Sequence, residues 1–89
     1  MASFVISYDL SAPGRDYADL YGRIKSYGTW AHITESTWFI VANRTSIEVR
    51  DNLKEALDTN DNLMVAKLTG EAAWRGLSDA QNDWIKKNL

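Results

Sequence analysis

An aspartate closes the first apolar run of the sequence, and its chemistry needs an explanation. Over residues 3–9 the side chains alternate between an apolar side and a more polar side, which ends at Asp9. This period of two is typical of a β-strand. A carboxylate at the end of a buried strand costs free energy unless it is paired, hydrogen-bonded or bound to a cation. Asp9 is therefore a candidate metal ligand and catalytic residue.

The chemistry open to Asp9 depends on what joins it. Mg²⁺ in proteins takes one or two carboxylates together with waters and substrate phosphate oxygens, so a lone carboxylate does not complete a site. A second copy of the chain would supply a second carboxylate, and a cation between the two could activate water for attack on a phosphodiester. The alternative is structural: Asp9 accepts a hydrogen bond within the turn that follows it.

Three other polar residues are candidates for a site near Asp9. Arg15 follows the Pro13-Gly14 turn and could bind a phosphate through its guanidinium, although a solvated side chain is the alternative. Ser36 could orient a nucleic-acid ligand, but no neighbouring base supports a nucleophilic serine, and a turn or strand start is the alternative. His32 is the only histidine and has no clustered partners for a metal.

Aromatic side chains are numerous and could stack on unpaired bases. Because they occur at strand and helix periods, we assign them to the core and to interfaces instead. They are Trp30, Trp38, Trp74 and Trp84 with Tyr8, Tyr17, Tyr21 and Tyr27.

Composition limits the class of protein. The 89 residues are enough for one small domain, and 45% hydrophobic residues are enough for a core. The net charge of −2 argues against a domain that coats nucleic acid through overall positive charge. Cysteine is absent, which excludes disulfides and thiolate metal sites. No apolar run approaches the roughly 20 residues of a membrane span, and we expect a cytoplasmic protein without a membrane partner.

The elements that would position these residues follow from periodicity and from end signals. Apolar residues at spacings of three and four predict helices, and Thr45 with Glu48 forms a capping-box pattern. The first expected elements are a strand over 3–9 and a helix that starts at Asp16 and stops at Gly28. Two strands follow, one on either side of Glu35-Ser36, and then a helix after Thr45. A strand over 63–68 and a last helix capped by Ser78 complete the order.

This order predicts an α+β fold, a ferredoxin-like βαββαβ sandwich with a four-stranded antiparallel sheet. Residues 1–69 form its core, and residues 70–89 form a C-terminal extension with a helix in the same domain. Strands one and three lie in the middle, and the first two helices cover one face. The other face, which carries Val5, Ser7 and Asp9, must be covered by the C-terminal segment, by a second copy of the chain, or by both.

Several of these features occur together in a known family. A strand ending in Tyr8-Asp9-Leu10, an aromatic strand opening Ser36-Thr37-Trp38-Phe39, and a strand ending in Ala66-Lys67-Leu68 resemble the small CRISPR-associated Cas-two family over residues 3–69. The resemblance implies a ferredoxin-like protomer that forms a homodimer through its sheet faces, with the two Asp9 side chains brought together.

The same resemblance implies two alternative functions. Family members have been described as Mg²⁺- or Mn²⁺-dependent endonucleases that act on RNA or DNA, and also as non-catalytic scaffolds in spacer integration. The sequence departs from the family pattern at Thr34, where Gln is common. After Leu68 it has the segment Gly70 to Gly76 and a helix instead of an additional strand. The Trp-rich tail suggests a stand-alone branch outside CRISPR loci, which argues against a role in integration.

Overall fold

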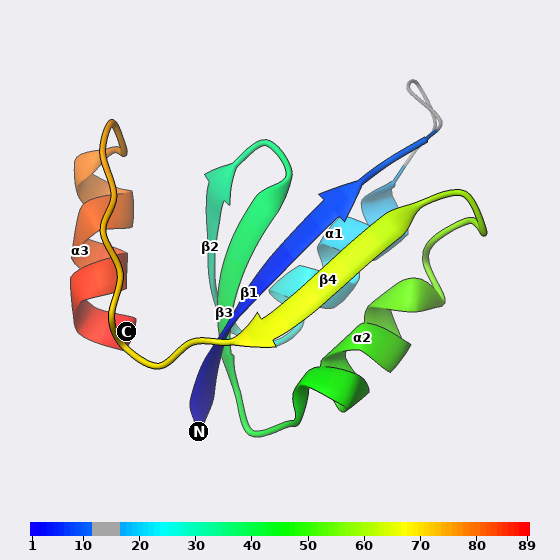
Figure 1. Ribbon diagram of the computed structural model, residues 1–89, viewed down its shortest axis with the longest axis horizontal. Helices are drawn as coiled ribbons and strands as arrows, with labels where there is room; N and C mark the ends of the chain where they lie inside the picture. The colour runs from blue at the N-terminus through cyan, green and yellow to red at the C-terminus, as the bar shows by residue number, and fades with distance from the viewer. Residues whose placement is uncertain (12–16) are drawn as a thin grey trace.

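The structure is a computed structural model that describes residues 1–11 and 17–89. Within these residues it contains strands and helices in the order expected from the sequence, including the C-terminal helix (Figure 1). They are β1 (Ala2–Asp9), α1 (Ala18–Lys25), β2 (Thr29–Thr34), β3 (Thr37–Ala42), α2 (Ser46–Lys54), β4 (Asn62–Lys67) and α3 (Asp79–Asn88).

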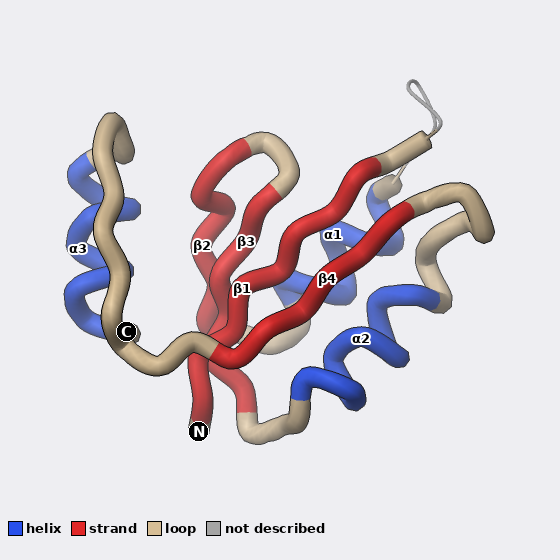
Figure 2. The backbone as a smooth tube through the Cα atoms, in the orientation of Figure 1, coloured by secondary structure: helices blue, strands red, loops and turns tan. Residues whose placement is uncertain are grey.

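The four strands form one antiparallel sheet with the order β2-β3-β1-β4 (Figure 2). The central positions of β1 and β3 confirm the expectation from sequence, and β2 and β4 are the edges. In the register of the sheet, Val5 of β1 lies opposite Phe39 of β3 on one side and Ala66 of β4 on the other. Directly opposed residues point to the same face of a sheet, so this register determines which residues share each face.

The core lies between the sheet and the first two helices. The even-numbered side chains of β1 and β3 are buried there, together with one side of α1 and one side of α2. The principal members of this core are Phe4, Ile6, Tyr8, Leu20, Ile24, Trp38, Ile40, Val49 and Leu53. Because side chains alternate along a strand, the odd-numbered residues of β1 and β3 lie on the second face.

Helix α3 covers the part of the second face near β2, beside which it lies in Figure 1. Ile85 is 2% exposed, and the Trp84 ring lies 6.3 Å from that of Phe39. The Gln81 Nε2 donates to the carbonyl oxygens of His32 at 2.6 Å and Ile33 at 3.1 Å. These contacts hold the helix against β2 and β3.

Helix α3 reaches the β1 and β4 side of the second face at Ser3, whose hydroxyl donates to the Asn88 carbonyl oxygen at 2.6 Å. Val5 and Ser7 are half-buried, whereas Met64, the register partner of Ser7, is 58% exposed. The C-terminal segment therefore covers one half of this face and leaves the other half open to solvent.

Both predicted caps are present. Thr45 and Glu48 form a reciprocal capping box at the start of α2, and Ser78 caps α3 in the same way with Gln81. The expected cap of α1, Asp16, lies outside the described residues. That helix begins at Ala18 and ends at Lys25, earlier than the stop at Gly28 that the sequence suggested, because the next residues form short i to i−3 hydrogen bonds.

The aromatic residues differ from expectation in part. Trp38 is buried in the core as predicted, but Trp30 and Trp74 are each more than a third exposed. Trp30 lies on an edge strand, where its ring faces the Lys25 ammonium at 5.2 Å, and the Trp74 indole N–H donates to Asn82 Oδ1 at 2.9 Å. These two do not belong to the core of a single chain, and the interface role that the sequence also allowed for them stays a prediction, since burial at an edge depends on what packs beside it. None of the described helices is long and apolar enough to cross a membrane.

The core assignment predicts a contrast between two apolar residues of α2. Leu53 is fully buried and Ile47 is 62% exposed. We expect Leu53→Ala to lower the free energy of unfolding by about 2–5 kcal/mol through lost burial and a cavity. Ile47→Ala should change it by less than about 0.5 kcal/mol. Urea unfolding followed by tryptophan fluorescence measures both, and equal losses would contradict this description of the core.

Candidate functional site

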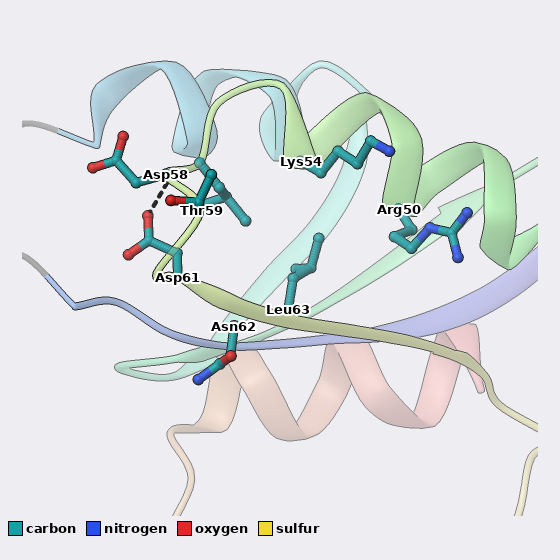
Figure 3. Close-up of a pocket in the computed structure, with 8 residues that line it drawn as sticks. Arg50, Lys54, Asp58, Thr59, Asp61, Asn62 and Leu63 are labelled. Carbon is teal, nitrogen blue, oxygen red and sulfur yellow. Dashed lines mark hydrogen bonds between the residues drawn. The ribbon is translucent and has the colours of Figure 1, made fainter.

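Asp9 is exposed at the end of β1, where its register partner is Asn62 at the start of β4. Figure 3 shows the Asn62 side chain pointing to the side of the sheet on which α3 lies, whereas Leu63 points toward α2. Directly opposed residues share a face, so Asp9 also lies on the second face. This is the face predicted for it from the alternation of β1.

The Asp9 carboxylate has no hydrogen bond or ion pair to any other residue that the structure describes. Exposure to water removes the desolvation cost that first drew attention to it. The carboxylate is also available to a cation or to a donor on a second molecule.

Ser36 lies close to this end of β1. It belongs to the turn between β2 and β3, one residue before β3 begins, and its carbonyl oxygen accepts a hydrogen bond from the Tyr8 N–H at 3.1 Å. The β1–β3 ladder therefore brings Ser36 alongside the residue that precedes Asp9. Arg15, the third predicted site residue, lies outside the described residues.

A chain of hydrogen bonds that begins in the core supports the Ser36 turn. The Trp38 indole N–H donates to the Tyr8 hydroxyl at 2.9 Å, and that hydroxyl donates to the Glu35 carbonyl oxygen at 3.1 Å. His32 Nε2 bonds to the same carbonyl at 3.1 Å, and the His32 ring stacks on Trp38 with centroids 3.9 Å apart. Burial raises the pKa of the Tyr8 hydroxyl. His32 thus belongs to the scaffold of the turn.

Asp61 is the residue at this end of the sheet that sequence reasoning missed. Its Oδ1 accepts from the Ser11 N–H at 2.8 Å, the Ser11 hydroxyl at 2.9 Å and the Tyr17 hydroxyl at 3.1 Å, and its Oδ2 accepts from the Asp58 N–H at 2.9 Å (Figure 3). The backbone donors of Ser11 and then Asp58 lower the pKa of Asp61 from 3.8 to about 2. One carboxylate thereby joins the segment after β1 to the loop before β4. The only signal in the sequence was its place in a polar cluster, which we interpreted as a helix end.

The described residues of one chain do not complete a metal site at Asp9. Within residues 1–11 and 17–89 there is no group of three or more His, Cys, Asp or Glu side chains that could hold a metal ion. Asp9 offers one carboxylate. The Asp61 carboxylate, at the same end of the sheet, accepts hydrogen bonds from the Ser11 and Asp58 N–H groups of the loops instead. A Mg²⁺ or Mn²⁺ ion at Asp9 would therefore need ligands from a second copy or from a bound substrate.

The Asp61 contacts predict a pH dependence of stability. The folded-state pKa of about 2 lies below the ordinary 3.8, so the contribution of the ionised carboxylate is fully present above about pH 4 and is lost as the pH falls through about 2. We expect Asp61→Asn to melt at a lower temperature than the native chain at pH 7, and the gap to shrink between about pH 4 and 2. Thermal melts by circular dichroism test this, with the exposed Asp83→Asn as control. A gap that does not change with pH would contradict it.

Comparison with known proteins shows a similar fold in one solved structure. No protein-family model matches the sequence. The crystal structure of a hypothetical protein TT1823 from Thermus thermophilus is similar, with a TM-score of 0.65 and 22% sequence identity over 84% of this chain and 90% of that one. At this level of identity the similarity concerns the fold alone, which is α+β with a four-stranded antiparallel sheet.

Proposed function

We propose that the chain is a homodimeric, nucleic-acid-associated protein of the Cas-two-like, ferredoxin-like type, which cleaves phosphodiester bonds at a divalent-metal site shared by two Asp9 carboxylates. One observation carries the proposal: Asp9 is exposed and, among the described residues, unpaired, on the half of the second face that α3 leaves open. The proposed activity is that of an endonuclease on RNA or DNA, with Ser36 and Arg15 near the substrate backbone.

The open half of the second face supports the homodimer. It joins Val5 and Ser7 of β1 to Met64 and Ala66 of β4, and Met64 is 58% exposed. In a two-fold dimer the same patch lies on both sides of the interface. Burial of this apolar area favours association, and pairing along β1 would bring the two copies of Asp9 to one seam.

The dimer supplies ligands that the described residues of one chain lack. Two facing carboxylates repel each other when ionised, and a bound cation relieves that repulsion. When bound, Mg²⁺ or Mn²⁺ would supply activation of a water molecule and neutralisation of phosphate charge. The protein's part is to hold Asp9 at the end of a central strand, where the sheet limits its movement.

A second candidate function is a non-catalytic dimeric scaffold or interaction module. The absence of a three-ligand group within the described residues favours it, as does a net charge of −2, which gives no general attraction for nucleic acid. In this candidate the dimer is kept, and Asp9 has a structural role.

A nuclease assay separates the two candidates. Labelled RNA and DNA are incubated with the native chain, Asp9→Asn and the control Asp83→Asn, each with Mg²⁺ or Mn²⁺ and with EDTA. We expect metal-dependent cleavage that falls at least about 100-fold in Asp9→Asn, since metal catalysis contributes several kcal/mol. Asp83→Asn should be fully active. Equal rates for native chain and Asp9→Asn, or no cleavage by either, would select the scaffold.

The dimer interface has its own test. We expect the native chain to sediment as a dimer at micromolar concentration, and Met64→Glu to weaken the dimer at least about tenfold by placing like charges at the seam. Ile47→Glu is the matched control, because it introduces the same charge at a similarly exposed residue, 62% against 58%, on the helix layer. A native chain that is monomeric at about 100 μM would contradict the interface.

A further inference from the structure

A groove between α2 and β4 lies apart from the Asp9 face. It has a volume of about 490 Å³, which is within the range of small-molecule sites. Its walls come from the later part of α2, the loop that follows and the start of β4 (Figure 3). Lining residues that matter for its chemistry are Arg50, Lys54, Leu57, Asp58, Asp61 and Leu63.

Charge is distributed unevenly along this groove. Arg50 and Lys54 are four residues apart on α2 and lie on the same side of the helix. Figure 3 shows Asp58 and Asp61 at the other end, with Leu63 between the two ends. The groove therefore has a basic end and an acidic end, separated by an apolar floor.

Both basic side chains can reach an added anion. The contacts of Arg50 are with the carboxylate of the adjacent Asp51, to which Nε and Nη2 donate at 3.1 and 2.9 Å. Both members of this pair are about half exposed, and exposed pairs of this kind are weak. The Lys54 ammonium has no hydrogen bond or ion pair to the residues that the structure describes. A phosphate can therefore bind to both without breaking a strong contact, and the Arg50 guanidinium is suited to hold it by two bonds.

The acidic end determines the orientation of a ligand. The Asp61 carboxylate already accepts four hydrogen bonds. Its pKa is lowered to about 2, so it is ionised at neutral pH. Its charge repels a phosphate placed beside it. A phosphate is therefore favoured at Arg50 and Lys54, and the side chains of Leu57 and Leu63 suit a flat, apolar group that extends from it.

We propose that this groove binds a nucleotide, with its phosphate at Arg50 and Lys54 and its base over Leu57 and Leu63. A free mononucleotide and one nucleotide of a single strand share this chemistry. The groove lies on the helix side of the sheet and Asp9 on the other side, so the inference does not depend on the metal site or on nuclease activity.

The test is a binding measurement in EDTA, where no metal-dependent cleavage occurs. Fluorescence anisotropy follows a fluorescein-labelled single-stranded pentanucleotide, and adenosine 5′-monophosphate is added as competitor. The double variant Arg50→Gln/Lys54→Gln is compared with the matched control Arg75→Gln/Lys86→Gln, which removes the same charge from exposed residues of the C-terminal segment. Asp51→Asn removes the carboxylate that competes for Arg50.

We expect the groove variant to bind at least about tenfold more weakly and with a salt slope reduced by about 0.7, which corresponds to one phosphate that is no longer neutralised on a single strand. The control should bind as the native chain does, and Asp51→Asn should bind more tightly. If adenosine 5′-monophosphate displaces the oligonucleotide, the ligand of the groove is a free mononucleotide. If the oligonucleotide binds and the mononucleotide does not displace it, the ligand is a nucleotide within a single strand. Equal weakening in both double variants, or no binding of either ligand, overturns the proposal. Because binding is measured in EDTA, the result does not depend on whether the chain cleaves nucleic acid, which separates it from the nuclease assay.

Discussion

The packing of alternate side chains of β1 and β3 against α1 and α2 is the constraint on which the other features depend. Phe4, Ile6 and Tyr8 are buried in that core, so the intervening residues of β1 must lie on the opposite face. A slip of one residue would place Asp9 among apolar side chains and expose three core residues. The position of the candidate carboxylate is therefore a consequence of core packing, and the same packing fixes β4 beside it through the Asp9–Asn62 register.

Local signals were sufficient for most of the fold. The strands were evident from their alternation, and the caps at Thr45 and Ser78 act on residues only three further along the chain. The element order and the starts of α2 and α3 therefore followed from neighbours in the chain, although the part of Gln81 in the second capping box was not predicted. The end of α1 was placed too late because Gly28 suits either a helix stop or the turn in which it lies with a positive φ. The exposure of Trp30 and Trp74 depends on sheet edges and on the course of the C-terminal segment, which local patterns do not specify.

The candidate site was predictable only where strand pairing determines it. Asp9 and Ser36 come together because the antiparallel ladder places Ser36 opposite Tyr8. The role of Asp61 could not be predicted, since its donor Ser11 lies 50 residues away in sequence. Whether two copies of Asp9 meet depends on contacts with a second molecule, which a single chain does not contain. The sequence likewise gave no indication that Arg50 and Lys54 would line a groove, because its acidic end comes from a loop whose position only the tertiary fold sets.

Helix α3 has a geometric consequence for any assembly through the second face. It is held on β2 and β3 by Gln81 and Trp84, and it projects from the second face beside the open half. A flat approach of two whole sheets is therefore blocked, and two copies can meet only when each is displaced sideways so that its raised edge clears the other. The two-fold axis of such a dimer must then pass near β1 or β4. The position of α3 thereby limits how far one sheet is displaced relative to the other.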